Sequence, residues 1–144
     1  MAVLLVRHAD AGDRDAWAAP DHLRPLTARG ESQAEDLATA LAGFDVTRVL
    51  SSPYLRCSQT AAPLAAARAL AVEPCDDLAE GQGRAGLALV RNLLAGGSHV
   101  VLCTHGDVVE AVLDGLGVRR HDETGKGATW VLNQAGAQCL PPPR

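Results

Sequence analysis

Two apolar runs, each followed by a histidine, constrain the fold of this chain more than any other feature of its sequence. The first run covers residues 2–6 and precedes Arg7 and His8, and the second covers residues 99–104 and precedes His105. Such runs are typical of strands buried in a parallel sheet. Ligands of open α/β sheets bind at the carboxyl ends of the strands, although a lone Arg-His pair is more often structural than catalytic. The sequence therefore predicts that these polar side chains share one edge of a sheet.

Helical patterns alternate with the strands. A helix is expected after Thr27, which has the character of an N-cap, and should end near Gly43. A second helix is expected to start at residues 51–53, with Ser as its cap and Pro at its first position, which puts Arg56 in the first turn. A third is expected over 86–94. The fourth is expected to be capped by Asp107, with Glu110 at the capping-box spacing, and to end at Gly117.

Further strands are expected at residues 46–50, 70–73, 128–133 and 137–140. Strands that alternate with helices predict an α/β fold, a three-layer sandwich whose largely parallel central sheet has helices on both faces. We expect a single domain over residues 1–144. Residues 9–25 and 119–127 are expected to be loops, the first a functional lid, and the Pro-rich tail from residue 141 is expected to be frayed.

Composition limits the ligands and the compartment. The formal net charge of −4 and an aromatic content of 3% argue against nucleic acid and anionic membranes as partners. No apolar run approaches the length of a membrane span or resembles a signal peptide, so we expect a cytoplasmic protein. The four cysteines are scattered, and we expect them to be reduced core residues.

Three patterns that suggest a cofactor or a metal fail on inspection. Residues 81–86 match G-x-G-x-x-G, but no convincing strand precedes them and no suitable acid follows. The segment Gly125-Lys126-Gly127 lacks the Ser or Thr that ends a phosphate loop. The histidines do not show metal-ligand spacing, although His8 and His105 could together hold a metal. We therefore expect neither a cofactor nor a metal.

Five blocks of the sequence occur in an order that resembles the histidine phosphatase superfamily, with its phosphoglycerate-mutase-like fold. They are Arg7-His8-Ala9, residues 26–30 with Gln33-Ala34, residues 51–56 with Gln59-Thr60-Ala61, residues 78–80, and residues 104–107. The short chain is similar to the small SixA-type phosphohistidine phosphatases and to the phosphatase-like domain that follows Nudix domains in some bacterial proteins. Lys126, Gly127 and Trp130 resemble both groups.

The resemblance implies a role for each candidate residue. His8 would be the nucleophile that forms a phosphohistidine intermediate, and Arg7, Arg56 and His105 would bind the phosphoryl group. His105 would also stabilise developing negative charge. Glu80 would protonate the leaving group and later activate water, although it could equally be a solvated loop carboxylate.

The resemblance also concerns residues next to these motifs. Asp10, Ser52 and Thr104 are expected to orient the site, and Ala9 replaces the Gly usual in the Arg-His-Gly motif, which could narrow it. The expected partner of this monomer is a phosphorylated protein or a small phosphate ester. The favoured function is a protein phosphohistidine phosphatase. The alternatives are a small-molecule or nucleotide phosphomonoesterase and a binding module that holds a phosphorylated ligand without turnover.

Overall fold

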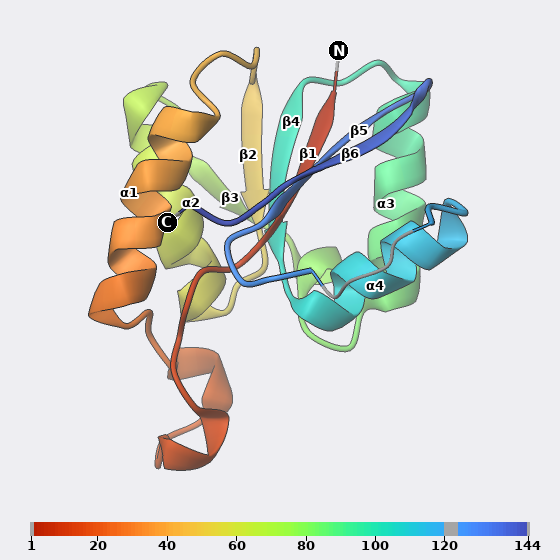
Figure 1. Cartoon of the computed structure of the whole chain (residues 1–144). Coiled ribbons are helices and arrows are strands. Elements are labelled where there is room, and N and C mark those ends of the chain that lie inside the picture. Colours follow the sequence, from red (N-terminus) through yellow and green to blue (C-terminus); the bar gives the residue numbers. More distant parts are fainter. Residues whose placement is uncertain (1, 120–123, 144) are drawn as a thin grey trace.

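A computed structural model describes residues 2–119 and 124–143 of the chain (Figure 1). Within these residues a single sheet has six strands in the order β3-β2-β4-β1-β5-β6. The first four in this order are mutually parallel, and β5 and β6 are antiparallel to their neighbours. The largely parallel sheet predicted from the sequence is thereby confirmed. The strands are β1 (Val3–Arg7), β2 (Arg48–Ser51), β3 (Val72–Pro74), β4 (Val100–Thr104), β5 (Thr129–Asn133) and β6 (Gly136–Leu140).

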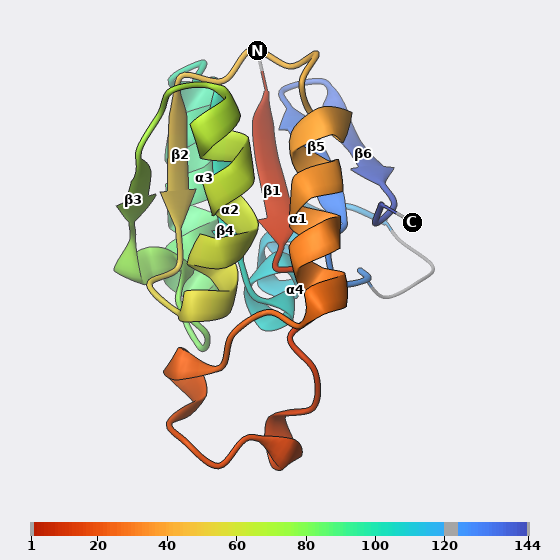
Figure 2. The ribbon, with the colours of Figure 1, turned by 90° about the vertical axis from the view of Figure 1, so that its left-hand side faces the viewer.

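Four α-helices in the described residues cover the two faces of the sheet. Helices α1 and α2 pack together on one face, and α3 and α4 pack together on the other (Figures 1 and 2). Short 3-10 turns occupy the connections. The helical elements are α1 (Ala28–Ala40), α2 (Leu55–Ala67), α3 (Gly83–Ala95), α4 (Gly106–Gly115), η1 (Arg14–Ala16), η2 (Asp21–Leu23) and η3 (Asp76–Leu78).

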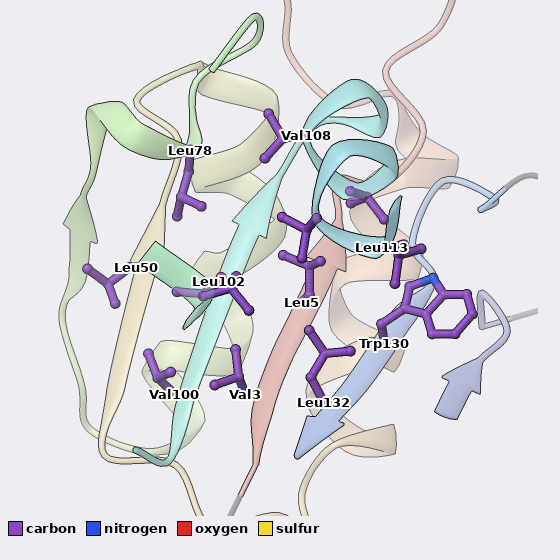
Figure 3. Packing of buried hydrophobic residues seen from close by; sticks show 13 residues of the cluster. Val3, Leu5, Leu50, Leu78, Val100, Leu102, Val108, Leu113, Trp130 and Leu132 are labelled. Atoms are coloured by element: carbon purple, nitrogen blue, oxygen red, sulfur yellow. The ribbon is translucent and has the colours of Figure 1, made fainter. Parts of the chain in front are cut away.

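Strand β1 supplies side chains to two separate cores because successive residues of a strand point to opposite faces. Val3 and Leu5 pack with residues of α3 and α4. Figure 3 labels Val3 and Leu5 together with Val108 and Leu113 of α4. Leu4 and Val6 pack with residues of α1 and α2. All four side chains are at most 1% exposed, so β1 is the buried centre of the sheet.

The register between β1 and β4 brings the two histidines together. Arg7 lies opposite Thr104 in the parallel ladder, so the next residues, His8 and His105, leave the sheet side by side. Their ring centroids are 5.6 Å apart. Residues 9–27 project from the body of the protein beyond this edge (Figures 1 and 2).

For two of the predicted helices the predicted N-cap residue is wrong. Helix α2 begins at Leu55 with Tyr54 as its N-cap, not at residues 51–53. The Ser52 hydroxyl accepts from Tyr54 N and also bonds to His105, so it connects the start of α2 to His105 without being the N-cap. Helix α4 begins at Gly106 with His105 as its N-cap, and Asp107 lies inside its first turn. The Asp107 carboxylate accepts hydrogen bonds from Val108 N next to it and from Gly81 N across the site. Thr27 caps α1 as expected, because its hydroxyl accepts from Gly30 N.

Some other predictions are also corrected. Helix α3 starts at Gly83, three residues before the predicted position. Cys57 and Cys103 are buried free thiols, but Cys75 is half-buried and Cys139 is exposed on β6, an edge strand, so not all cysteines are in the core. Pro142 lies against the turn at residues 125–127, so the tail is not simply frayed. Residues 120–123 of the expected 119–127 loop lie outside the described residues.

Candidate active site

His8 is held in one tautomer at the end of β1. Its side chain is 6% exposed, and Nδ1 lies 2.8 Å from the Ala9 carbonyl oxygen. A carbonyl can only accept, so Nδ1 carries the proton and donates it. The lone pair of the ring is therefore on Nε2. This is the tautomer required of an imidazole that attacks through Nε2.

The surroundings of His8 also keep it neutral. Burial is the largest cause that lowers the pKa of His8 from 6.5 to about 3, and the neighbouring His105, Arg56 and Arg7 lower it further, against the hydrogen bond to the Ala9 carbonyl, which raises it. A neutral imidazole is the nucleophilic form, so His8 is ready to react over the whole physiological pH range.

We expect the His8 ring not to titrate between pH 5 and 8 in an NMR experiment, with the resonance identified by its loss in His8→Ala. Because the unfolded chain takes up a proton on His8 below pH 6.5 and the native protein does not, stability falls as the pH decreases towards 3. His8→Ala should relieve this loss by on the order of 3 kcal/mol at pH 4. A midpoint near pH 6.5 for the His8 resonance would contradict the burial argument.

His105 lies beside His8 and bonds to Ser52. Its Nε2 lies 2.8 Å from the Ser52 hydroxyl, which also accepts from Tyr54 N. When the Ser52 hydroxyl donates to Nε2, the ring proton is on Nδ1. Tyr54 packs edge-on against this ring with centroids 4.7 Å apart, which fixes the plane of the imidazole.

Arg7 reaches the site along the start of α4. Its Nη1 donates to the Thr124 carbonyl, and its guanidinium lies over Gly106. A Cβ at Gly106 would be 3.0 Å from Arg7 Cζ and Nε, closer than most carbon contacts in proteins. Gly106 is thus required by the close approach of the guanidinium.

The substitution Gly106→Ala should displace the Arg7 guanidinium by a few tenths of an ångström. Misplacement of a binding group by a fraction of an ångström costs about tenfold in kcat/KM. The inhibition constant of inorganic phosphate should rise with it. Gly43→Ala is the matched control, since a Cβ there meets nothing within 4 Å. Equal kinetics for the two variants would show that Arg7 placement is unimportant.

Arg56 is a fully buried cation in the first turn of α2, as predicted. Its side chain is 0% exposed, and its two terminal nitrogens bond to the carbonyl and the carboxylate of Asp21 at 3.0 Å. Tyr54 covers one face of the guanidinium, 5.0 Å from the ring centroid. A buried charge of this kind is costly unless anions surround it.

Three buried nitrogens have no hydrogen-bond partner in the described part of the chain. They are Arg7 Nε, Arg56 Nε and His105 Nδ1. Buried donors are nearly always satisfied in folded proteins, so unpaired ones call for an explanation such as a bound ligand. All three belong to residues predicted to hold a phosphoryl group, and all three residues are near His8. The arrangement is chemically suited to a small oxyanion.

Glu80 also reaches this space. A cleft of about 440 Å³ is lined by Arg7, His8, Glu80 and His105 together with residues of the projecting segment. Glu80 Oε1 lies 2.6 Å from Arg14 and 3.6 Å from Arg56, so the carboxylate faces arginines from two other elements. The structure thus brings four of the five predicted site residues to one cleft, and the fifth, Arg56, does not line the cleft but lies 3.6 Å from Glu80.

Three charged residues at the cleft or beside it were missed by the sequence reasoning. Arg24 is 6% exposed and donates to the carbonyls of Ala11 and Gly12. Asp21 bonds to Arg24 at 3.1 Å, and Arg14 reaches Glu80. All three lie in the expected lid, where no periodicity marks them. The sequence offered one indication among these residues: Arg24 directly precedes Pro25 and the capped start of α1, where the backbone is restricted.

Of the residues expected to orient the site, Ser52 contacts a site residue directly and Thr104 does not. Ser52 contacts His105, but Thr104 donates to the Leu78 carbonyl at 2.5 Å, below the site. Asp10 accepts from Thr27 and lies 3.7 Å from Lys126, at the edge of the cleft. Ala9 is fully buried with Ala11 and other apolar side chains, and it is not among the cleft-lining residues, so its methyl does not narrow the cleft.

Side chains of α1 and α2 fix the backbone that leaves His8. Gln33 accepts from Asp10 N at 2.9 Å, Thr60 accepts from Ala9 N at 3.0 Å, and Gln59 accepts from Leu26 N at 2.8 Å. The two ends of the projecting segment are therefore anchored to the helices. This explains why glutamines occur in the otherwise apolar faces of these helices.

The described residues contain no cluster of three or more His, Cys, Asp or Glu side chains arranged to hold a metal ion. Among the helices that the structure describes, none is long and apolar enough to cross a membrane.

Comparisons with known proteins agree on one family. Residues 3–87 match the model of the histidine phosphatase superfamily (branch 1). The 8-oxo-(d)GTP phosphatase of Mycolicibacterium smegmatis is 33% identical over an alignment 155 residues long, which covers 98% of this chain and 48% of that protein. The phosphohistidine phosphatase SixA of Escherichia coli is 42% identical over 62 residues, which cover 42% of this chain and 37% of that protein. The chain thus spans about half or less of the length of these curated relatives.

Solved structures give the same result over the whole chain. SixA complexed with tungstate superposes with a TM-score of 0.78 at 26% identity, covering 97% of this chain and 94% of that one. A SixA-like protein from Agrobacterium tumefaciens superposes with a TM-score of 0.80 at 27% identity, covering 98% of both chains. These relatives, several of them named as phosphatases, support a phosphatase enzyme. The chain belongs to the histidine phosphatase superfamily.

Proposed function

We propose that this protein is a phosphatase that transfers a phosphoryl group to His8 Nε2 and then hydrolyses the phosphohistidine intermediate, with a phosphorylated histidine on a protein as substrate. The observation that carries the proposal is the set of three unpaired buried donors on Arg7, Arg56 and His105 beside a neutral His8. Positive charge fixed in advance around a reacting phosphoryl group is the main catalytic device of phosphoryl transfer.

The first step joins His8 to phosphorus. The Nε2 lone pair attacks phosphorus while the bond to the leaving group breaks and the leaving group departs with the bonding electrons. The guanidinium groups of Arg7 and Arg56 and the Nδ1 proton of His105 bind the phosphoryl oxygens as charge builds on them. The hydrogen bond from Nδ1 to the Ala9 carbonyl stabilises the positive charge that the His8 ring gains.

In the second step water attacks phosphorus and His8 leaves with its electron pair restored on Nε2. Glu80, which lines the cleft, accepts the proton of the attacking water. Inorganic phosphate then departs, and Glu80 releases its proton to the solvent. With that release every group is back in its starting state.

The relatives support two substrate classes. Similarity to SixA over nearly the whole chain favours a phosphohistidine protein. A nucleotide is the second candidate, because the relative that covers 98% of the chain in sequence is named for 8-oxo-(d)GTP. Both candidates use the same reaction at His8.

A direct comparison of substrates tests the proposal. Phosphate release should be measured from a phosphohistidine-containing protein, nucleoside di- and triphosphates and sugar phosphates, with His8→Ala as background. The proposal expects His8-dependent release, highest from phosphohistidine. Highest release from a nucleotide would favour the second candidate. Tight binding of an unhydrolysed ligand without His8-dependent release would instead show a binding module.

A further inference from the structure

The projecting segment, residues 9–27, exposes apolar side chains beside the cleft (Figure 2). Trp17 is 36% exposed and Leu23 is 48% exposed, and within the described residues these are the two large hydrophobic side chains that face solvent. The small apolar residues between them, Ala18, Ala19 and Pro20, are exposed as well. Single exposed hydrophobic residues are common on proteins, but a group of them on one projecting element is typical of a binding surface.

Contacts at its base and its tip hold this segment in one shape. Arg24, which is 6% exposed, donates to two carbonyl oxygens near the start of the segment. Asp21 bonds to the buried Arg56 at 3.0 Å. At the tip, the Trp17 indole Nε1 donates to the Pro20 carbonyl at 3.1 Å. The apolar side chains are therefore presented in a fixed arrangement, which lowers the entropic cost of binding a partner.

A row of rings connects this apolar surface to the reacting centre. His22 of η2 lies edge-on to Tyr54 with ring centroids 6.3 Å apart, and Tyr54 lies edge-on to His105 with centroids 4.7 Å apart. Residues 12–14 of the same segment line the cleft itself. A substrate that places its phosphoryl group at His8 and extends beyond the cleft therefore meets the projecting segment.

The exposed charge of the segment is negative. Asp13 and Asp15 are both exposed, and the Asp13 carboxylate accepts from Asp15 N at 2.9 Å. The positive charges of the same segment are already engaged, because Arg14 pairs with Glu80 and Arg24 is buried. A partner that complements this surface combines apolar side chains with basic ones.

We propose that the projecting segment is a docking surface for the protein that carries the phosphohistidine, on which Trp17 and Leu23 bind apolar side chains flanked by basic ones. A phosphohistidine within a protein brings a polypeptide surface to the rim of the cleft, whereas a small phosphate ester has no polypeptide to contact these residues. This inference rests on the proposed function, and it identifies how the enzyme binds the part of the substrate that lies outside the cleft.

The test compares substrates that share one leaving group. They are free phosphohistidine, a synthetic peptide whose phosphohistidine is flanked on both sides by leucine and lysine, and the same peptide with serine in their place. The wild-type protein should have its highest kcat/KM for the leucine and lysine peptide. Trp17→Ala/Leu23→Ala should raise KM for that peptide by about tenfold or more, the usual effect of truncating an aromatic anchor. Its kcat, and the turnover of free phosphohistidine, should not change.

Fluorescence quenching reports the contact directly. In His8→Ala, which prevents turnover, the leucine and lysine peptide should protect the exposed Trp17 from a soluble quencher, and free phosphohistidine should not. Trp130 is 7% exposed and contributes a constant background. His8→Ala/Trp17→Phe should lose the protection, which assigns the signal to Trp17.

Gln138→Ala is the control for truncation of an exposed side chain, since Gln138 lies on the edge strand β6 and should keep the wild-type kinetics. Equal losses for the peptide and for free phosphohistidine in Trp17→Ala/Leu23→Ala, or no loss for either, would overturn the docking surface and leave the phosphatase proposal intact. A loss confined to nucleotide substrates would overturn it in favour of a base that stacks on Trp17. Absence of His8-dependent turnover of every phosphohistidine substrate would overturn both proposals.

Discussion

Replacing His8 by alanine should lower kcat for every substrate by about 10⁴-fold or more, as removal of a covalent nucleophile does in other enzymes. The structure gives the reason: His8 Nε2 carries the free lone pair, and residues with unpaired buried nitrogens, Arg7, Arg56 and His105, are its neighbours. His105 differs from His8, since its Nε2 bonds to Ser52. Water attacking directly would retain only the electrostatic contribution of the arginines.

The control for this variant is His99→Ala. His99 precedes β4 and so lies at the opposite edge of the sheet from His8. Both variants should show cooperative thermal unfolding, and only His8→Ala should lose activity. Residual turnover in His8→Ala within tenfold of the wild type would contradict a covalent role.

Replacing Arg56 by alanine should lower kcat/KM by about 10² to 10³-fold, the usual effect of removing one preorganised donor to a developing anion. The effect should be larger than expected for a surface arginine because the Arg56 side chain is fully buried. Arg56→Lys should recover little, since an ammonium cannot reproduce the planar arrangement of guanidinium donors.

This loss should be accompanied by weaker inhibition by inorganic phosphate, which separates phosphate binding from a general effect on folding. Arg48→Ala is the control, because its side chain is 54% exposed and pairs with Glu73 far from the cleft. If Arg56→Ala unfolds as the wild type does and keeps its phosphate affinity, Arg56 does not bind the phosphoryl group.

The sequence was most informative where a strand ends in a chemically distinctive residue. The runs before His8 and His105 predicted two buried strands, and parallel pairing in register then requires the histidines to be neighbours. Arg56 could be placed because a helix start close to a strand end points back over the sheet edge. These inferences depend only on local periodicity and on the common direction of parallel strands.

Sequence reasoning failed where a residue's role is set by contacts across long separations. Ser52 and Asp107 each accept from a nearby backbone N–H, as an N-cap side chain can, but Ser52 also bonds to His105 and Asp107 to Gly81, so tertiary contacts were added that the sequence did not predict. The contact of Arg14 with Glu80 joins two loops 66 positions apart. Irregular segments carry no period from which such a contact could be predicted.

The most direct test of the central claim is to trap the covalent intermediate. The protein is mixed with a radiolabelled phosphorylated substrate, quenched within one turnover and digested, and the label is mapped. The account predicts label on the peptide that contains His8, stable in base and lost in acid, and absent from His8→Ala. Turnover of the same substrate without label on His8, or with acid-stable label on another residue, would contradict it.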